Sequence, residues 1–123
     1  MHVVSKILAS IVALIHVYIL ILEMFLWEMR GPDAFSSFPP ELFSQTTSMA
    51  ANQGLYNGFL AAGLIWALVF IRDQAWKRHV AVFFLGCVAI AGIFGAVTVS
   101  KTIFFIQALP AILGLVSLVA LRK

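Results

Sequence analysis

Two ionisable side chains inside the first long apolar stretch are the strongest candidates for chemistry. His16 and Glu23 lie seven residues apart, which places them on one face of a helix with Leu20 between them. An ionisable group inside a membrane is costly, by roughly 2.5–3.5 kcal/mol for Asp, Lys or Arg at mid-helix, and such groups commonly mark functional sites. Acid–base catalysis by Glu23, with His16 orienting the carboxyl or relaying protons, is therefore one hypothesis.

Polar side chains of later helices are expected at the depth of Glu23. The second apolar stretch carries four of them within its first two turns, and the fourth stretch carries one amide near its start. Buried polar groups need hydrogen-bond partners, and these groups could supply one another. We expect them to converge inside the bundle, with the face that carries Gly54 and Gly58 packed elsewhere. The expected ligand-binding set is Asn52, Gln53, Tyr56, Asn57 and Gln107.

This polar layer is compatible with several functions, which the sequence leaves open. The leading interpretation is a site in the outer-leaflet third of the bundle for a small apolar or amphipathic molecule, such as a quinone, isoprenoid or lipid. One alternative is a hydrogen-bonded plug that fixes the helix register. Another is a small proton-coupled transporter or an accessory subunit. That role requires an oligomer such as a homodimer, because four short helices hardly enclose a translocation path.

The composition indicates that these polar residues belong to a membrane protein. Of the 123 residues, 63% are hydrophobic and 11% are charged, against about 25% charged residues in soluble proteins. A chain this short cannot hide so much apolar surface from water, so the lipid bilayer is its expected partner. The fold prediction is all-α, an antiparallel four-helix membrane bundle that forms one domain over residues 1–123. Its helices are expected at about residues 4–27, 40–71, 78–99 and 102–121.

The basic residues indicate the orientation of this bundle. On one side of a four-helix arrangement lie Lys6, Arg72, Lys77, Arg78, Arg122 and Lys123. Only Arg30 and Lys101 fall on the other side. The positive-inside rule then places both termini in the cytoplasm and the long connection from Glu28 to Ser48 outside.

Four prolines and one glycine shape the connections and the last helix. Gly31, Pro32, Pro39 and Pro40 are expected to break helices within the long connection. Pro40, followed by Glu41, is expected to start the second helix outside the membrane. Pro110 removes one backbone donor within the fourth helix, so we expect a kink there.

Other kinds of site find little support. Cys87 is the single cysteine, which excludes an internal disulfide and a cysteine-based zinc site. His2, His16 and His79 are too far apart in the expected topology to share a metal, so no metal site is expected. No basic patch is interleaved with aromatic residues, which argues against nucleic acid as a partner. The residues identify no cofactor.

Four stretches of the sequence resemble a bacterial family of small membrane proteins. They are HVYILILEMFLW in the first helix, AANQGLYNGFLAAGL in the second, GCVAIAGIFGAVT in the third and QALPAIL in the fourth. The family is known only as domain of unknown function number thirteen-zero-four. The resemblance covers nearly the whole chain and implies a four-helix, multi-pass protein of the bacterial inner membrane. It implies no activity and no catalytic residues.

Overall fold

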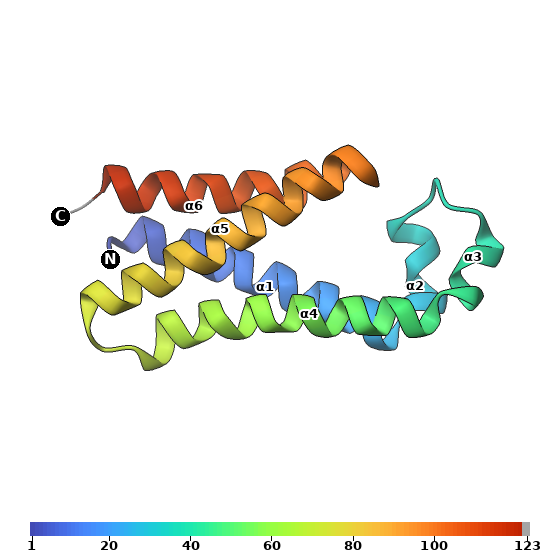
Figure 1. Ribbon diagram of the computed structural model, residues 1–123, viewed down its shortest axis with the longest axis horizontal. Helices are drawn as coiled ribbons and strands as arrows, with labels where there is room; N and C mark the ends of the chain where they lie inside the picture. Colours follow the sequence, from blue (N-terminus) through green and yellow to red (C-terminus); the bar gives the residue numbers. More distant parts are fainter. Residues whose placement is uncertain (122–123) are drawn as a thin grey trace. The chain divides into compact units, whose positions relative to one another are not determined.

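The protein consists of helices joined by short connections in a computed structural model that describes residues 1–121 (Figure 1). This part of the chain contains no β-strand, so the all-α prediction is confirmed. Arg122 and Lys123, which the sequence analysis assigns to the basic side, lie outside the described residues. With η denoting π-helix, the elements in chain order are α1 (Val3–Phe25), α2 (Trp27–Ala34), α3 (Pro40–Gln45), α4 (Thr47–Ile65), η1 (Trp66–Phe70), α5 (Gln74–Thr98), η2 (Phe104–Ala108) and α6 (Leu109–Ala120).

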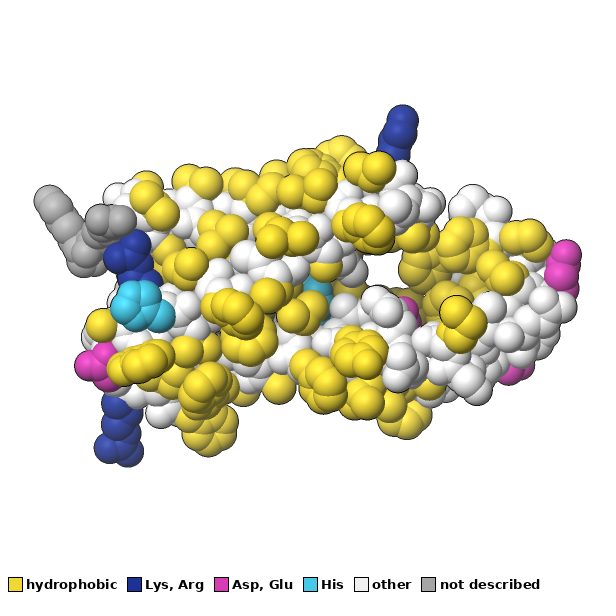
Figure 2. All heavy atoms as spheres, in the orientation of Figure 1, with side chains coloured by type: hydrophobic (Ala, Val, Ile, Leu, Met, Phe, Trp, Pro, Cys, Tyr) yellow, Lys and Arg dark blue, Asp and Glu magenta, His cyan; other side chains and the backbone are white. Residues whose placement is uncertain are grey.

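Three helical stretches are long and apolar enough to cross a membrane. They are Val3–Phe25, Thr47–Phe70 and Gln74–Thr98, and a further apolar stretch, Phe104–Ala120, is shorter. Apolar side chains cover much of the visible face of the long helices in Figure 2, and most charged side chains in that view lie at helix ends. Exposed apolar surface of this kind is tolerated in lipid and not in water. The structure therefore indicates a membrane protein, and the four-helix bundle and the orientation of its termini stay predictions.

The chain forms two compact units, one made of Met1–Ile15 with Leu60–Lys123 and the other of His16–Phe59. In the first unit α5 packs along η2 and α6. Gly92 makes this contact possible, because a Cβ atom added to it would lie 2.5 Å from the backbone nitrogen of Ala108. Small residues allow such close approach between membrane helices. The apolar core of the unit includes Leu64, Leu85, Val88 and Ala111.

A buried pair of serines joins the first and the last helix of the chain within the first unit. The Oγ atoms of Ser5 on α1 and Ser117 on α6 are 2.9 Å apart, and both side chains are buried. Ser117 also lies 2.7 Å from the carbonyl oxygen of Gly114 in its own helix. The pair therefore satisfies two polar groups within an otherwise apolar contact.

The expected kink near Pro110 coincides with a π-helical segment. The N–H of Leu109 donates to the carbonyl of Phe104, five residues earlier, where an α-helix would use Phe105. Pro110 has no N–H and cannot take part in a regular α-helical ladder. The wider π-helical turn of η2 therefore directly precedes Pro110, the residue that interrupts the α-helical hydrogen bonds.

The expected connection between the first two spans contains two short helices of the second unit. α2 includes Pro32, and α3 begins at Pro40. Aromatic rings hold α2 and α3 together, with the ring centroids of Trp27 and Phe43 5.1 Å apart and those of Trp27 and Phe35 5.6 Å apart. These contacts stabilise helical turns that Gly31 and Pro32 would disfavour in isolation.

α3 does not run directly into α4, although one helix is expected from residue 40 to residue 71. The chain bends at Thr46, whose hydroxyl donates to the carbonyl of Leu42 at 2.8 Å. In a continuous α-helix the amide of Thr46 would bond that carbonyl, but it lies 3.3 Å from the carbonyl of Phe43 instead. The side chain of Thr46 thus competes with the helical ladder and separates the two helices.

Candidate functional site

The centre of the candidate site is a hydrogen bond between α1 and α4 in the second unit. The Nδ2 atom of Asn57 donates to the Oε1 atom of Glu23 over 2.7 Å. Glu23 is 8% exposed and Asn57 is buried to the same degree. The amide also donates to the backbone carbonyl of Gln53 at 3.1 Å, which orients it toward the carboxyl. A carboxyl in the last turn of an apolar helix is therefore held, among the described residues, by a single side chain from another helix.

Two glycines of α4 bring the helix close enough to α1 for this bond to form. A Cβ atom added to Gly54 would lie 2.9 Å from the Cβ of Glu23 and 2.8 Å from the Cγ of Met24. A Cβ atom added to Gly58 would lie 2.4 Å from the Cδ1 of Leu20. The expectation that the Gly54 and Gly58 face packs away from the polar site is therefore wrong. The glycines lie beside the site because only residues without a side chain let the short amide reach the carboxyl.

His16 lies two turns before Glu23 on α1 and is 1% exposed. Seven residues correspond to roughly 10 Å along a helix axis, a separation that the two side chains do not span directly. Both side chains are buried, whereas Tyr18, between them in sequence, is exposed. The buried face of α1 thus carries both of its ionisable membrane residues.

The other residues of the expected ligand-binding set do not gather around Glu23 within this unit. The side chains of Asn52, Gln53 and Tyr56 are exposed, and Gln53 contributes through its backbone carbonyl. The ring of Tyr56 contacts that of Phe59 edge to face, with centroids 5.8 Å apart. Gln107 belongs to the first unit, where it is half-buried on η2.

The sequence interpretation missed a second polar cluster at the junction of α2 and α4. The indole nitrogen of Trp27 donates to the Oγ1 of Thr46 at 2.9 Å, and the Thr47 hydroxyl donates to the Oε1 of Glu28 at 2.8 Å. Threonine pairs before an apolar run commonly begin a helix, and this signal could have located the start of α4. The cluster joins the chain just after Glu23 to the start of the helix that carries Asn57.

Across residues 1–121, no group of three or more His, Cys, Asp or Glu side chains could hold a metal ion. The groups that the site presents are a carboxyl and an amide in an apolar surrounding. These groups can bind a hydrogen-bonding head group or exchange a proton with it.

Comparison with known proteins gives the family. Residues 10–119 match the model of a family described as proteins of unknown function, DUF1304. The chain belongs to the DUF1304 family. This DUF1304 chain is also similar to the uncharacterised protein YpaA of Lactococcus lactis subsp. lactis strain IL1403, with 30% identity over 119 residues, which cover 95% of this chain and 98% of YpaA. No solved structure matches the chain.

Membership of the DUF1304 family agrees with the sequence resemblance and brings no activity with it. The match includes His16, Glu23, Asn57 and Gln107, so the candidate site lies within the family region of the chain. The function has to be argued from the chemistry of the site itself.

Proposed function

We propose that this protein is an integral membrane protein that binds a small amphipathic molecule, with Glu23 and Asn57 at the polar end of the site. The site belongs to the outer third of the proposed four-helix bundle, in the inner membrane of a bacterium. The polar head of a quinone, an isoprenoid or a lipid would bind the carboxyl. Its apolar part would lie along aliphatic and aromatic side chains, as in most small-molecule sites.

The observation that supports this proposal is the incomplete hydrogen bonding of a buried carboxyl. A carboxylate offers about four lone-pair sites on two oxygens. Among the described residues, Asn57 is the only one that donates to Glu23. Oε2 of Glu23 is not among the buried atoms that lack a partner, so this oxygen keeps some accessible surface at which a ligand could donate to it. The unfilled acceptor capacity favours a ligand that carries a hydroxyl group, such as a quinol, an isoprenoid alcohol or a diacylglycerol.

Catalysis is a further step of the same proposal. Glu23 would act as an acid–base group on the bound head, and His16 would orient it or relay its proton. Because the two side chains are two turns apart on α1, a relay requires a water molecule or a ligand atom between them. Binding is the part of the proposal that can be tested first.

Binding is tested with the full chain in neutral detergent and with Trp27 as the reporter. Trp66→Phe and Trp76→Phe leave Trp27, one turn after Glu23, as the sole tryptophan. Geraniol, a short-chain quinol and a short-chain diacylglycerol are titrated in turn while the fluorescence of Trp27 is recorded. We expect at least one of them to bind, and Glu23→Gln to weaken its affinity at least tenfold because the charged acceptor is lost.

Glu41→Gln is the matched control for this experiment. Glu41 is an exposed acid on α3, and removing its charge should leave the affinity unchanged. Equal affinities of the wild type and Glu23→Gln for every probe would contradict the proposal. So would a loss of affinity in Glu41→Gln as large as that in Glu23→Gln.

A second candidate function, as the subunit of an oligomeric transporter or membrane complex, is favoured by one observation. Asn52, Gln53 and Tyr56 are exposed on α4, within a stretch long and apolar enough to cross a membrane. Polar side chains facing lipid are costly, and a second copy of the chain could provide hydrogen-bond partners for them.

Crosslinking of Gln53→Cys in a Cys87→Ser background tests this homodimer in native membranes. A chain that stays monomeric there would contradict transport.

A further inference from the structure

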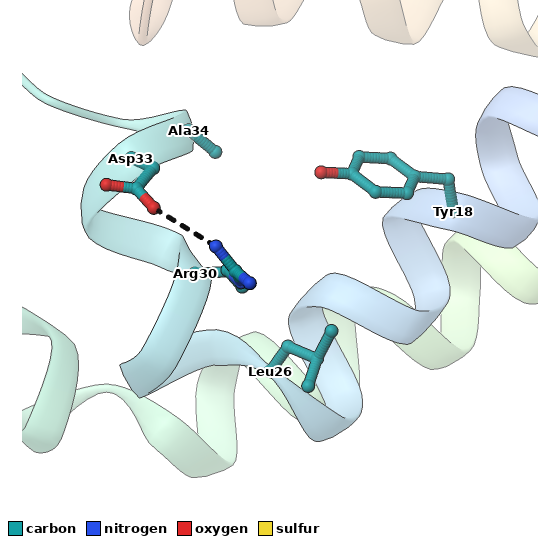
Figure 3. A pocket seen from close by; sticks show the side chains of 5 residues that line it. All are labelled: Tyr18, Leu26, Arg30, Asp33 and Ala34. Carbon is teal, nitrogen blue, oxygen red and sulfur yellow. Dashed lines mark ion pairs between the residues drawn. The ribbon is translucent and has the colours of Figure 1, made fainter.

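An open cavity of about 380 Å³ lies beside the end of α1 in the second unit (Figure 3). It forms where α1 ends at Phe25 and the chain bends at Leu26 before α2 begins. In Figure 3 the Tyr18 ring from α1 and the Arg30 guanidinium from α2 point into the same space. The lining residues are Tyr18, Leu26, Arg30, Asp33 and Ala34.

Two hydrogen-bond donors in this cavity have unused capacity. The side chain of Arg30 forms an ion pair with Asp33, but the Nη1–Oδ2 distance is 3.9 Å and the two side chains are 63% and 77% exposed. Such an exposed pair contributes little and exchanges readily with other partners. A guanidinium carries five N–H groups and a tyrosine one O–H. Among the described residues, none accepts a hydrogen bond from the side chain of Arg30 or Tyr18.

The position of the cavity combines a polar end with an apolar one. Tyr18 lies seven residues before the end of α1, roughly 10 Å along the helix axis. Arg30 and Asp33 lie on α2, beyond the apolar stretch, whereas Leu26 and Ala34 supply apolar walls. In the predicted topology this end of α1 reaches the outer membrane surface, where lipid head groups lie. A basic residue is uncommon on that side, which makes Arg30 notable.

We propose that this cavity binds a phosphoryl anion, with Arg30 and Tyr18 as its hydrogen-bond donors. Arginine binds phosphate oxygens through two parallel N–H groups, and the Tyr18 hydroxyl adds a third donor. Asp33 opposes binding, because its carboxylate competes for Arg30 and repels the anion. The source that fits the membrane surface is the head group of a phospholipid, and free phosphate is the other. This site uses the exposed face of α1 and goes beyond the function proposed for the buried Glu23.

The experiment measures binding by native mass spectrometry of the full chain in neutral detergent. The three probes are dihexanoyl phosphatidylglycerol, inorganic phosphate and dihexanoylglycerol, which has no phosphate. We expect the phospholipid to bind and Arg30→Gln to weaken its affinity at least tenfold. Tyr18→Phe should weaken it about threefold. Asp33→Asn should tighten it about threefold at low salt, since it removes the competing carboxylate.

A control variant and a fixed background separate this site from general charge effects and from the Glu23 site. Lys101→Gln removes the other basic residue expected on the outer side and should bind the phospholipid as its parent does. The measurements are made in a Glu23→Gln background, so that binding at the buried carboxyl does not contribute. In that background, an unchanged affinity in Arg30→Gln, a loss in Lys101→Gln as large as that in Arg30→Gln, or binding of dihexanoylglycerol as tight as that of the phospholipid would overturn the proposal. Competition by inorganic phosphate at equal concentration would support the phosphoryl site and contradict a lipid as its source.

Discussion

Two buried polar pairs connect helices that are distant in sequence, and they differ in how much each side chain depends on its partner. Ser5 and Ser117 lie with their hydroxyl oxygens 2.9 Å apart, and Ser117 also reaches a carbonyl of its own helix. Glu23 is bonded only to the amide of Asn57 among the described residues. A serine can satisfy its hydroxyl within one helix, whereas an ionised carboxyl can only accept, and the amides of its helix are already used. The serine pair is therefore a packing contact, whereas the Glu23 carboxyl keeps the acceptor capacity on which the proposed site depends.

The largest effect is expected for the glycine beside the carboxyl. Gly54→Ala would place a Cβ atom 3.2 Å from the backbone carbonyl of Leu20 and 2.9 Å from the Cβ of Glu23, atoms that cannot rotate away. We expect a loss of about 1–3 kcal/mol in the free energy of unfolding, the usual range for overpacking. Chemical unfolding in mixed micelles measures it. Gly86→Ala is the control, since no atom lies within 4 Å of the added Cβ.

The Glu23–Asn57 bond itself should give the next largest effect. A double-mutant cycle with Glu23→Ala and Asn57→Ala should return a coupling free energy of about 0.6–1.7 kcal/mol, as for hydrogen bonds between membrane helices. The same unfolding assay provides all four values. A coupling free energy near zero would mean that the two side chains do not depend on each other, and the contrast with the serine pair would disappear.

A smaller effect is expected for the glycine beside the serine pair. Gly114→Ala would bring a Cβ atom to 3.1 Å from the Cδ1 of Leu85, the flexible end of a side chain. Because Leu85 can adjust, we expect a loss below about 1 kcal/mol in the free energy of unfolding. If Gly114→Ala unfolds as easily as Gly54→Ala, the two contacts are packed equally tightly and the comparison fails.

The smallest effect is expected for the serine pair. In Ser117→Ala, the remaining Ser5 hydroxyl can donate to a carbonyl of its own helix. We expect the free energy of unfolding to change by no more than about 0.5 kcal/mol, close to the average for polar contacts between membrane helices. A loss above 1.5 kcal/mol, on the order of a hydrogen bond to a charged group, would show that this pair is not replaceable.

The helices and a polar layer were predicted from the sequence. Which polar residues meet α1 depends on the face of α4 that is turned toward it. Asn57 follows Gly54 by three residues, so the two share a face of the helix. Because Gly54 and Gly58 contact α1, Asn57 faces Glu23, while Asn52 and Tyr56 remain exposed. In the sequence, the two glycines mark the face of α4 that meets α1, but the prediction assigned them to a different face from the polar residues. The glycines and Asn57 must share one face, because the short amide reaches Glu23 only where the two helices approach closely.

Of the two helices between the first two spans, α3 begins at Pro40 as predicted, but α2 was not predictable from local propensity. Gly31 and Pro32 argue against a helix, yet α2 includes both. The ring contacts of Trp27 with Phe35 and Phe43 join residues up to 16 positions apart, and such tertiary contacts override propensity. The bend at Thr46 likewise depends on a threonine hydroxyl that competes with the backbone, a choice that spacing alone does not reveal.

The π-helical segment Phe104–Ala108 has a consequence for insertions and deletions. A π turn is an α-helix that has accommodated one additional residue, so each residue beyond it is rotated relative to an uninterrupted helix. Deleting one residue from this segment should restore α-helical hydrogen bonds up to Pro110 without reorienting the faces on either side. Elsewhere in a packed helix, a single deletion turns every later side chain by about 100°. In η2, losing a residue should therefore be milder than many substitutions.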